Sequence, residues 1–324
     1  MKLSVIIPYM NDLDVLQVIL PALLKECKLG ECEVIIIDNG SYLQLVYPDD
    51  RVRIVRKQSN IGVGGAFNQG VELAKADKIV IMGSDVIPQD GWFDRVISTL
   101  DNSTATIYNC VSSGFNDLKE PFGPSRIMRY GANLLYLVTK DDLPANSVLQ
   151  NDPKYSNILQ AKWRYQPPST DEFLPVECLL GAFYWMHKSD YEKIHGWNGH
   201  RMWGSLEPMF SIKARAHGIK LLVDTKLEAA HHYGRAPVDR PSREDLRFYN
   251  MLFMAHTMFS DALRDELIEH LRYGGREEKL EKLNVNVARL MIKRAHGLVQ
   301  VERDYNNRHF KHGLIKNWNK FNRI

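Results

Sequence analysis

The sequence is poor in cysteine and has no long apolar run. Its 324 residues contain four cysteines, which are scattered along the chain at Cys27, Cys32, Cys110 and Cys178. They show neither paired zinc-ligand spacing nor the density of a disulfide-rich secreted protein, so we expect buried free thiols. Because no stretch approaches the roughly 18 consecutive apolar residues of a membrane span, any contact with lipid must be peripheral.

We expect neither a secretory leader nor a low-complexity segment. The apolar run that follows Met1 and Lys2 ends at Pro8, which is too short for a signal peptide, and we therefore expect a cytoplasmic protein. Hydrophobic residues make up 44% of the chain and charged residues 25%, both ordinary for a globular protein. A chain of this length fits one large α/β domain with an appendage, or two unequal domains.

Charge of one sign is not in excess over the whole chain, but its distribution is uneven. The net charge is +3, and residues 286–324 hold nine Lys or Arg against two acidic residues, so this basic tail carries +7 and the remainder −4. Such a tail predicts contact with a polyanion, which could be phosphate-bearing lipid, nucleic acid or an acidic glycan. An ordinary solvated helix face is the alternative.

The basic tail also contains aromatic residues. Its cations are Arg289, Lys293, Arg294, Arg303, Arg308, Lys311, Lys316, Lys320 and Arg323, and its aromatic residues include Tyr305, Phe310, Trp318 and Phe321. A mixture of this kind can stack on bases, lie at a lipid headgroup surface, or form an amphipathic helix that covers the sheet. Because no recognised nucleic-acid motif is present, the sequence leaves these three interpretations open.

The first half of the chain alternates strand and helix patterns. Residues 3–8, 33–38, 53–56 and 78–82 are short runs rich in β-branched residues, as in strands that are buried on both faces of a parallel sheet. Residues between the first two strands, and residues 65–76, have helical spacing. Asp12, Asp38, Asn60 and Asp85 follow the four strands, where open α/β sheets bind their ligands.

The second half is less regular. Residues 105–110, 134–139 and 176–186 have strand patterns, the last interrupted by Gly181, and residues 167–171 form a loop. A helix is expected from Ser242 to about residue 274. Another helix places its apolar groups on one face, made of Leu280, Leu283, Val287, Leu290 and Met291. We therefore expect an α/β domain over residues 1–235 and a helical region over residues 236–324, which could also provide an oligomer contact.

Five runs of the sequence together resemble a known family. They are SVIIPYMND, VIIIDNGS, NIGVGGAFNQGVELAKADKIVIMGSDV, GAFYWMHKSDYEKIHGWN and WGSLEPMF. In this order they resemble the family-two glycosyltransferases of the GT-A fold, and the later runs are similar to the polypeptide N-acetylgalactosaminyltransferases. The resemblance covers residues 3 to about 235. It implies a mixed α/β sheet flanked by helices that binds a nucleotide-sugar donor.

The resemblance assigns donor contacts to the strand ends. Pro8 and Tyr9 would begin the nucleotide pocket, which Asp12 joins, and Asp38 would accept hydrogen bonds from the base or ribose. A plain turn is the alternative for Asp38, since Asp-Asn-Gly-Ser is good turn chemistry.

Asn60, Gly62 and Asn68 would lie beside the nucleoside, where small residues let the backbone approach an anion. A dinucleotide fingerprint is excluded because Phe67 occupies the position of its third glycine.

The metal motif departs from the family pattern, which usually has two aspartates one residue apart. Here Ser84 and Asp85 follow Gly83, so one acid remains. By the resemblance, Asp85 coordinates Mn²⁺ or Mg²⁺ together with His231 or His232, and diphosphate oxygens complete the site. An ordinary core or surface role is the alternative for the two histidines. The missing acid predicts a weaker dependence on the metal.

The last assigned positions face the donor sugar and the acceptor. Gly181 and Trp203 would line the donor side, although a strand glycine can simply allow close packing. Leu206 replaces the first acid of a family pair, so only Glu207 remains, and it would be the general base if the transfer inverts the anomeric centre. In a retaining transfer Glu207 would instead orient the donor or the acceptor. A carboxylate that stabilises the start of a helix is its alternative.

The sequence therefore predicts sugar transfer from a nucleoside diphosphate, with uridine as the base, to an acceptor hydroxyl. The rivals are a non-catalytic nucleotide-sugar-binding protein and a nucleic-acid-modifying sugar transferase.

Overall fold

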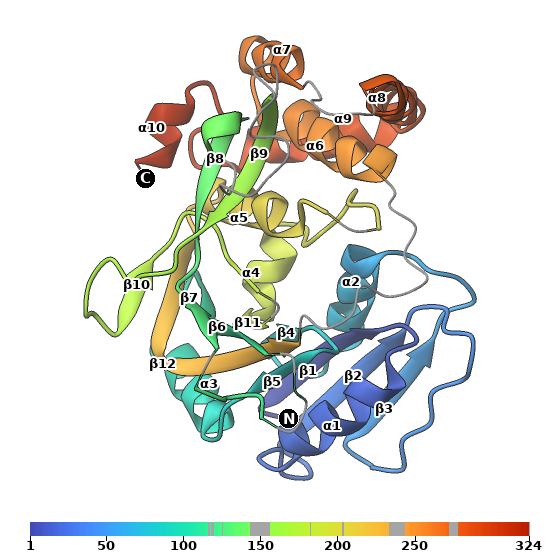
Figure 1. Cartoon of the computed structure of the whole chain (residues 1–324), viewed down its shortest axis with the longest axis vertical. Helices are drawn as coiled ribbons and strands as arrows, with labels where there is room; N and C mark the ends of the chain where they lie inside the picture. Colours follow the sequence, from blue (N-terminus) through green and yellow to red (C-terminus); the bar gives the residue numbers. More distant parts are fainter. Residues whose placement is uncertain are drawn as a thin grey trace.

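The protein folds around one large mixed sheet. The computed structural model describes residues 1–115, 117, 120–124, 126–142, 156–181, 183–202, 204–232, 244–271 and 278–323. Within these residues the chain forms a ten-stranded sheet, a separate two-stranded sheet, and helices that lie on the large sheet and beyond it (Figure 1). The predicted α/β architecture with a helical C-terminal region is confirmed.

The first four strands of the large sheet are parallel, and later strands complete it. Its strands are β1 (Leu3–Tyr9), β2 (Cys32–Asp38), β3 (Val52–Arg56), β4 (Lys78–Met82), β5 (Val86–Pro88), β6 (Thr106–Phe115), β7 (Ile127–Arg129), β10 (Phe173–Pro175), β11 (Phe183–His187) and β12 (Lys220–His232). The order across the sheet is β10-β12-β6-β11-β4-β1-β2-β3, with β5 beside β12 and β7 beside β6. β11 is antiparallel to both of its neighbours, β4 and β6.

The helices occur in two groups along the chain. The first group is α1 (Leu13–Leu24), α2 (Val63–Leu73), α3 (Trp92–Asp101), α4 (Lys188–Lys193) and α5 (Leu206–Ala216). The second group is α6 (Glu244–Met258), α7 (Asp261–His270), α8 (Glu278–Arg294), α9 (His296–His309) and α10 (Trp318–Asn322). The small sheet is a pair of antiparallel strands, β8 (Ala132–Thr139) and β9 (Ser156–Trp163), which rises toward the C-terminal helices in Figure 1. No helix in the described residues is both long and apolar enough to cross a membrane.

Alternate residues of β1 serve the two faces of the large sheet. Val5 and Ile7 belong to an apolar cluster with α1 and α3, whereas Ile6 belongs to a second cluster with α2. Successive side chains of a strand point to opposite faces, so a strand that is covered on both sides must be apolar throughout. This explains why the sequence of β1 reads as a continuous apolar run.

The C-terminal helices share one apolar core with the sheet. Phe248 and Phe253 of α6, and Phe321 of α10, are in the same buried cluster as Ile6 and Ile81 of the sheet. All four cysteines are free and buried, as expected. The proposed boundary between residues 235 and 236 falls in segment 233–243, outside the described residues, so the two-part division stays a prediction.

Two of the expected elements are wrong in their extent. Residues 176–186 do not form one strand: Gly181 has φ +65°, a left-handed conformation that breaks an extended chain, and β11 begins only at Phe183. The single helix expected from Ser242 is divided into α6 and α7, because the backbone N–H of Ser260 donates to the carbonyl of Ile315. The segment that contains Ser242 lies outside the described residues, as does the glycine pair expected to end this helix.

The apolar face predicted from the sequence of α8 is not the face that packs into the core. Val285, Ala288 and Ile292 are the buried side chains of the helix, whereas Leu283 and Leu290 are 57% and 56% exposed. Both sets of residues have helical spacing, so α8 carries apolar side chains on two faces. The sequence pattern identified the face that the core does not use.

Candidate functional site

Hydrogen bonds join the ends of β1 and β2 to the loop that precedes α2. The side-chain amide of Asn39 donates to the Oδ1 of Asn60 (3.0 Å), and its own Oδ1 accepts the N–H of Ile61 (2.8 Å). The Oδ1 of Asn60 also accepts the N–H of Gly62 (2.8 Å). The structure thus brings Asn60 and Gly62 to the strand ends, as the sequence predicted.

Asp38 is buried at the end of β2 and already has partners on both carboxylate oxygens. Oδ1 accepts the N–H of Ser41 (3.1 Å), and Oδ2 forms an ion pair with the Nη1 of Arg56 (2.9 Å). These contacts agree with the alternative interpretation of Asp38 as a residue that stabilises a turn. A base or ribose contact would have to share the same oxygens, and it stays a prediction.

The tyrosine at the end of β1 remains protonated at neutral pH. Burial, followed by the negative charges of Asp38, Asp12 and Asp14, raises the pKa of Tyr9 to about 12. Its neighbour Pro8 is half-buried and pairs in register with Ile37 of β2. Tyr9 therefore places a neutral phenol beside the predicted nucleotide pocket.

Asp85 and His231 meet at the end of β4. Their Oδ1 and Nε2 atoms are 3.5 Å apart, since β5 directly follows Asp85 and pairs with β12 at the register Val86 to His231. Burial is the main cause of a lowered pKa for His231, which favours the neutral imidazole that binds metals.

The neighbouring histidine has different surroundings. The His232 ring packs at a tilt against Phe115, with ring centroids 5.2 Å apart, and its backbone N–H donates to the carbonyl of Asp85. Successive strand residues point to opposite faces, which explains why the two imidazoles differ. Among the described residues, no cluster of three or more His, Cys, Asp or Glu side chains is placed to hold a metal ion.

Gly181 lies in the narrow crevice that also contains His231. Val86, Ser112 and Gly181 line this crevice with His231. Any side chain on Gly181 would collide with Ser112, because an added Cβ would be 2.6 Å from its Oγ. Close packing therefore accounts for the glycine, and its predicted contact with the donor sugar stays untested. Ser84 is buried beside Asp85.

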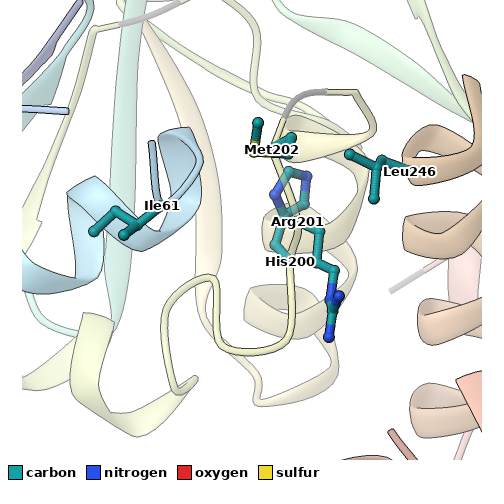
Figure 2. A pocket seen from close by; sticks show the side chains of 5 residues that line it. All are labelled: Ile61, His200, Arg201, Met202 and Leu246. Atoms are coloured by element: carbon teal, nitrogen blue, oxygen red, sulfur yellow. The ribbon is translucent and has the colours of Figure 1, made fainter. Parts of the chain in front are cut away.

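A pocket of about 300 Å³ lies between the loop before α2 and helix α6. Figure 2 shows Ile61 on one side, Leu246 of α6 on the other, and His200, Arg201 and Met202 between them. The loop of Met202 is joined to α2 by the N–H of Val63, which donates to the carbonyl of Met202 (3.1 Å).

The contact between the two loops requires a glycine at position 62. Gly62 has φ +81°, and an added Cβ would be 2.6 Å from the N atom of Met202. Because the predicted donor loop forms one wall of the pocket through Ile61, the pocket is a candidate for the acceptor side of the site.

Helix α6 holds the far wall of this pocket. The Oδ1 of Asn250 accepts the N–H of Arg201 (2.8 Å), and its Nδ2 donates to the carbonyl of Gly204 (2.9 Å). His200 has its Nε2 2.8 Å from the same carbonyl, and burial lowers the pKa of His200 to about 4. Trp203, one of the predicted donor residues, lies outside the described residues.

Glu207 lies in the first turn of α5, directly after this loop. Burial raises the pKa of its carboxyl group, and the indole N–H of Trp197 donates to the carbonyl of the preceding Leu206 (3.0 Å). A raised pKa suits a general base, but a position in the first turn also fits the structural alternative. Its catalytic role therefore stays a prediction.

Asn68 has structural partners. It lies inside α2, and its Oδ1 accepts the hydroxyl of Tyr191 and the N–H of Trp197. These contacts give Asn68 a structural role that does not require a nucleotide-sugar donor. Its predicted position beside the nucleoside therefore stays a prediction.

A buried carboxylate of α9 joins the C-terminal helices to the loop before α5. Glu302 is 1% exposed, and its Oε1 accepts the Nδ2 of Asn198 (2.7 Å) and lies 3.0 Å from the Nδ1 of His195. The Nζ of Lys213, also buried, lies 3.9 Å from its second oxygen. Burial lowers the pKa of Lys213 to about 8.

Sequence reasoning missed Asn39, Asn250 and Glu302. Asn250 has a signal that could have been used, because it is a lone amide inside the apolar run of α6, and a buried polar group needs partners. The aromatic residues of the basic tail were noticed but point inward: Phe310 and Phe321 are buried, and Trp318 stacks on Tyr136. The two buried phenylalanines are therefore not available to stack on bases.

Sheet order and site together define an α/β fold with polar residues gathered at the carboxyl ends of its first strands, the position at which open α/β sheets bind their ligands. Residues 4–153 match the family model described as glycosyl transferase family 2.

Two solved structures share the fold. The structure is similar to that of GalNAc-T7 with UDP, GalNAc and Mn²⁺, with a TM-score of 0.63 and 14% identity over 93% of this chain, which spans 58% of the GalNAc-T7 chain. It is also similar to S. aureus TarS 1-349 in complex with UDP-GlcNAc, with a TM-score of 0.51 and 16% identity over 94% of this chain and 88% of that chain.

These findings confirm the predicted resemblance to family-two glycosyltransferases of the GT-A fold.

Proposed function

We propose that the protein transfers a sugar from a nucleoside diphosphate donor, with uridine as the base, to an acceptor hydroxyl with the help of a divalent cation. The observation that carries this proposal is the pair of Asp85 and His231, 3.5 Å apart at the end of β4. The UDP of the GalNAc-T7 structure and the UDP-GlcNAc of the TarS structure support the choice of donor.

The residues at the end of β4 fit a cation bound jointly by protein and donor. Asp85 offers a carboxylate and His231 a neutral imidazole, and oxygens of the diphosphate and water would supply the other ligands. When bound, Mn²⁺ or Mg²⁺ supplies positive charge that stabilises the departing nucleoside diphosphate. With one carboxylate in place of two, we expect weak binding of the metal in the absence of donor.

The protein's own groups would position the reactants. The amide network of Asn39 and Asn60 fixes the loop before α2, and Tyr9 presents a neutral phenol beside it. The pocket at Ile61 and Met202 would receive the acceptor. In an inverting transfer, the carboxylate of Glu207 would accept the proton of the attacking hydroxyl, and its raised pKa makes it a stronger base.

Thermal shifts with nucleotide sugars test the proposal, because a ligand raises stability according to its affinity. UDP and UDP-sugars are titrated with and without Mn²⁺ into wild type, Asp85→Asn and His231→Ala. We expect the Mn²⁺-dependent part of the shift to disappear in both variants and to persist in His232→Ala, the matched control on the same strand. A full Mn²⁺-dependent shift in Asp85→Asn would contradict the metal site.

A non-catalytic protein that binds nucleotide sugars is the second candidate. Leu206 stands where the resembling family has an acid, and Gly83 precedes a single metal-site acid. Measuring donor consumption and transfer to simple saccharides separates the two: binding without turnover, with and without Mn²⁺, favours this candidate. The cytoplasmic location and an acidic or phosphate-bearing acceptor also stay proposals.

A further inference from the structure

Helix α8 carries an apolar stripe on the side that faces away from the core. Leu283 and Leu290 are 57% and 56% exposed, and the half-buried Val287 lies between them at helical spacing. The opposite side, with Val285 and Ala288, packs into the buried core. Figure 1 places α8 at the outer edge of the C-terminal helices. A helix that is apolar on two sides has one side left for a partner.

The charges around this stripe are basic. Arg294 continues the row of Leu283, Val287 and Leu290 by one further helical turn. Arg289 and Lys293, like Arg294, are exposed. The acidic residues of α8, Glu278 and Glu281, are confined to its first turn. The apolar stripe is therefore flanked by positive charge over its C-terminal half.

We propose that this face of α8 binds the surface of an anionic lipid bilayer. Leucine and valine side chains would enter the headgroup region while the cations contact lipid phosphates, as in helices that lie in the plane of a membrane. The rest of the chain has a net charge of −4 outside residues 286–324, so an anionic surface attracts this end of the molecule and repels the other.

A second copy of the chain fits the face less well. A two-fold contact would bring the cations of one α8 against those of the other, which is unfavourable. Three aliphatic side chains also provide far less than the roughly 800 Å² per partner that a stable interface buries.

Flotation of the full chain with vesicles tests the proposal. Vesicles of phosphatidylcholine alone are compared with vesicles that also contain phosphatidylglycerol. We expect binding to the anionic vesicles, and a decrease in affinity of at least about tenfold for Leu283→Asp/Leu290→Asp, since each leucine loses its burial in the headgroup region. Each basic residue contributes about fivefold, so Lys293→Glu/Arg294→Glu also weakens binding, and added salt weakens binding of the wild type.

Leu29→Asp is the matched control, because Leu29 is 72% exposed in the turn before β2. It should bind vesicles as the wild type does, and all variants should melt at the same temperature. Equal binding of the wild type to neutral and anionic vesicles would overturn the proposal. So would sedimentation of the wild type as a dimer that Leu283→Asp/Leu290→Asp dissociates. Neither readout depends on the proposed transferase activity.

Discussion

Gly62→Ala should lower the free energy of unfolding far more than the same substitution at an exposed glycine. The backbone at Gly62 has φ +81° and ψ 160°, a region that residues with a Cβ occupy at a cost of about 1–3 kcal/mol. The added Cβ would also lie 2.6 Å from the N atom and 2.9 Å from the Cα of Met202. Overlap with backbone atoms cannot be relieved by a rotamer change, and overpacking adds about 1–3 kcal/mol. We therefore expect a loss of about 2–6 kcal/mol.

Urea unfolding measures this difference, and Gly30→Ala provides the matched control. Gly30 has φ +83°, but an added Cβ would meet nothing within 4 Å. Gly30→Ala should therefore lower the free energy of unfolding only by the cost of a left-handed backbone conformation, about 1–2 kcal/mol. Gly62→Ala should also weaken the binding of UDP, because moving Met202 releases the loop before α2, which we propose for the donor. Titration with UDP measures this second effect. Equal losses of unfolding free energy in the two variants would refute the reasoning.

Two further predictions concern the buried ionisable groups. Glu302→Ala leaves Lys213 buried without its carboxylate, so the free energy of unfolding should fall by about 3–5 kcal/mol, and an unchanged urea midpoint would contradict this. His200 has a pKa of about 4 in the folded chain against an ordinary 6.5, so between pH 6.5 and pH 4 the unfolded chain binds more protons and stability falls as the pH falls. Urea unfolding at pH 7 and pH 5 should show a smaller loss in His200→Gln than in wild type, and equal losses would exclude His200 as a source of the pH dependence.

The first half of the molecule could be predicted from the sequence because β1, β2 and β4 are buried on both faces, whereas the edge strand β3 is only partly buried. Such strands are continuous apolar runs, and their ends align the polar residues that follow them. The pairing of Asp85 with a distant histidine came instead from the resemblance to family-two glycosyltransferases. The amide network of Asn39 could not be foreseen in the same way, because the turn pattern around it has the same composition whether or not it supports a site.

The second half was predicted less well because local patterns there have two solutions. On α8, Leu283 and Leu290 have the same periodicity as Val285 and Ile292, and only the tertiary packing shows which set is buried. The break between α6 and α7 depends on Ile315, a partner more than fifty residues away. The role of Asn250 likewise depends on a loop that approaches α6 only in the folded chain.

The position of β11 between β4 and β6 affects how the protein can be made. Met82 pairs with Phe183, so closing this part of the sheet brings together residues about a hundred positions apart, which is entropically costly and slow. Strands β1 and β2 pair over 29 positions and β2 and β3 over 18, so these parallel strands can assemble first during synthesis. His231 reaches Asp85 only after the later strands have joined, so a nascent chain can form its first strands well before the proposed metal site is complete.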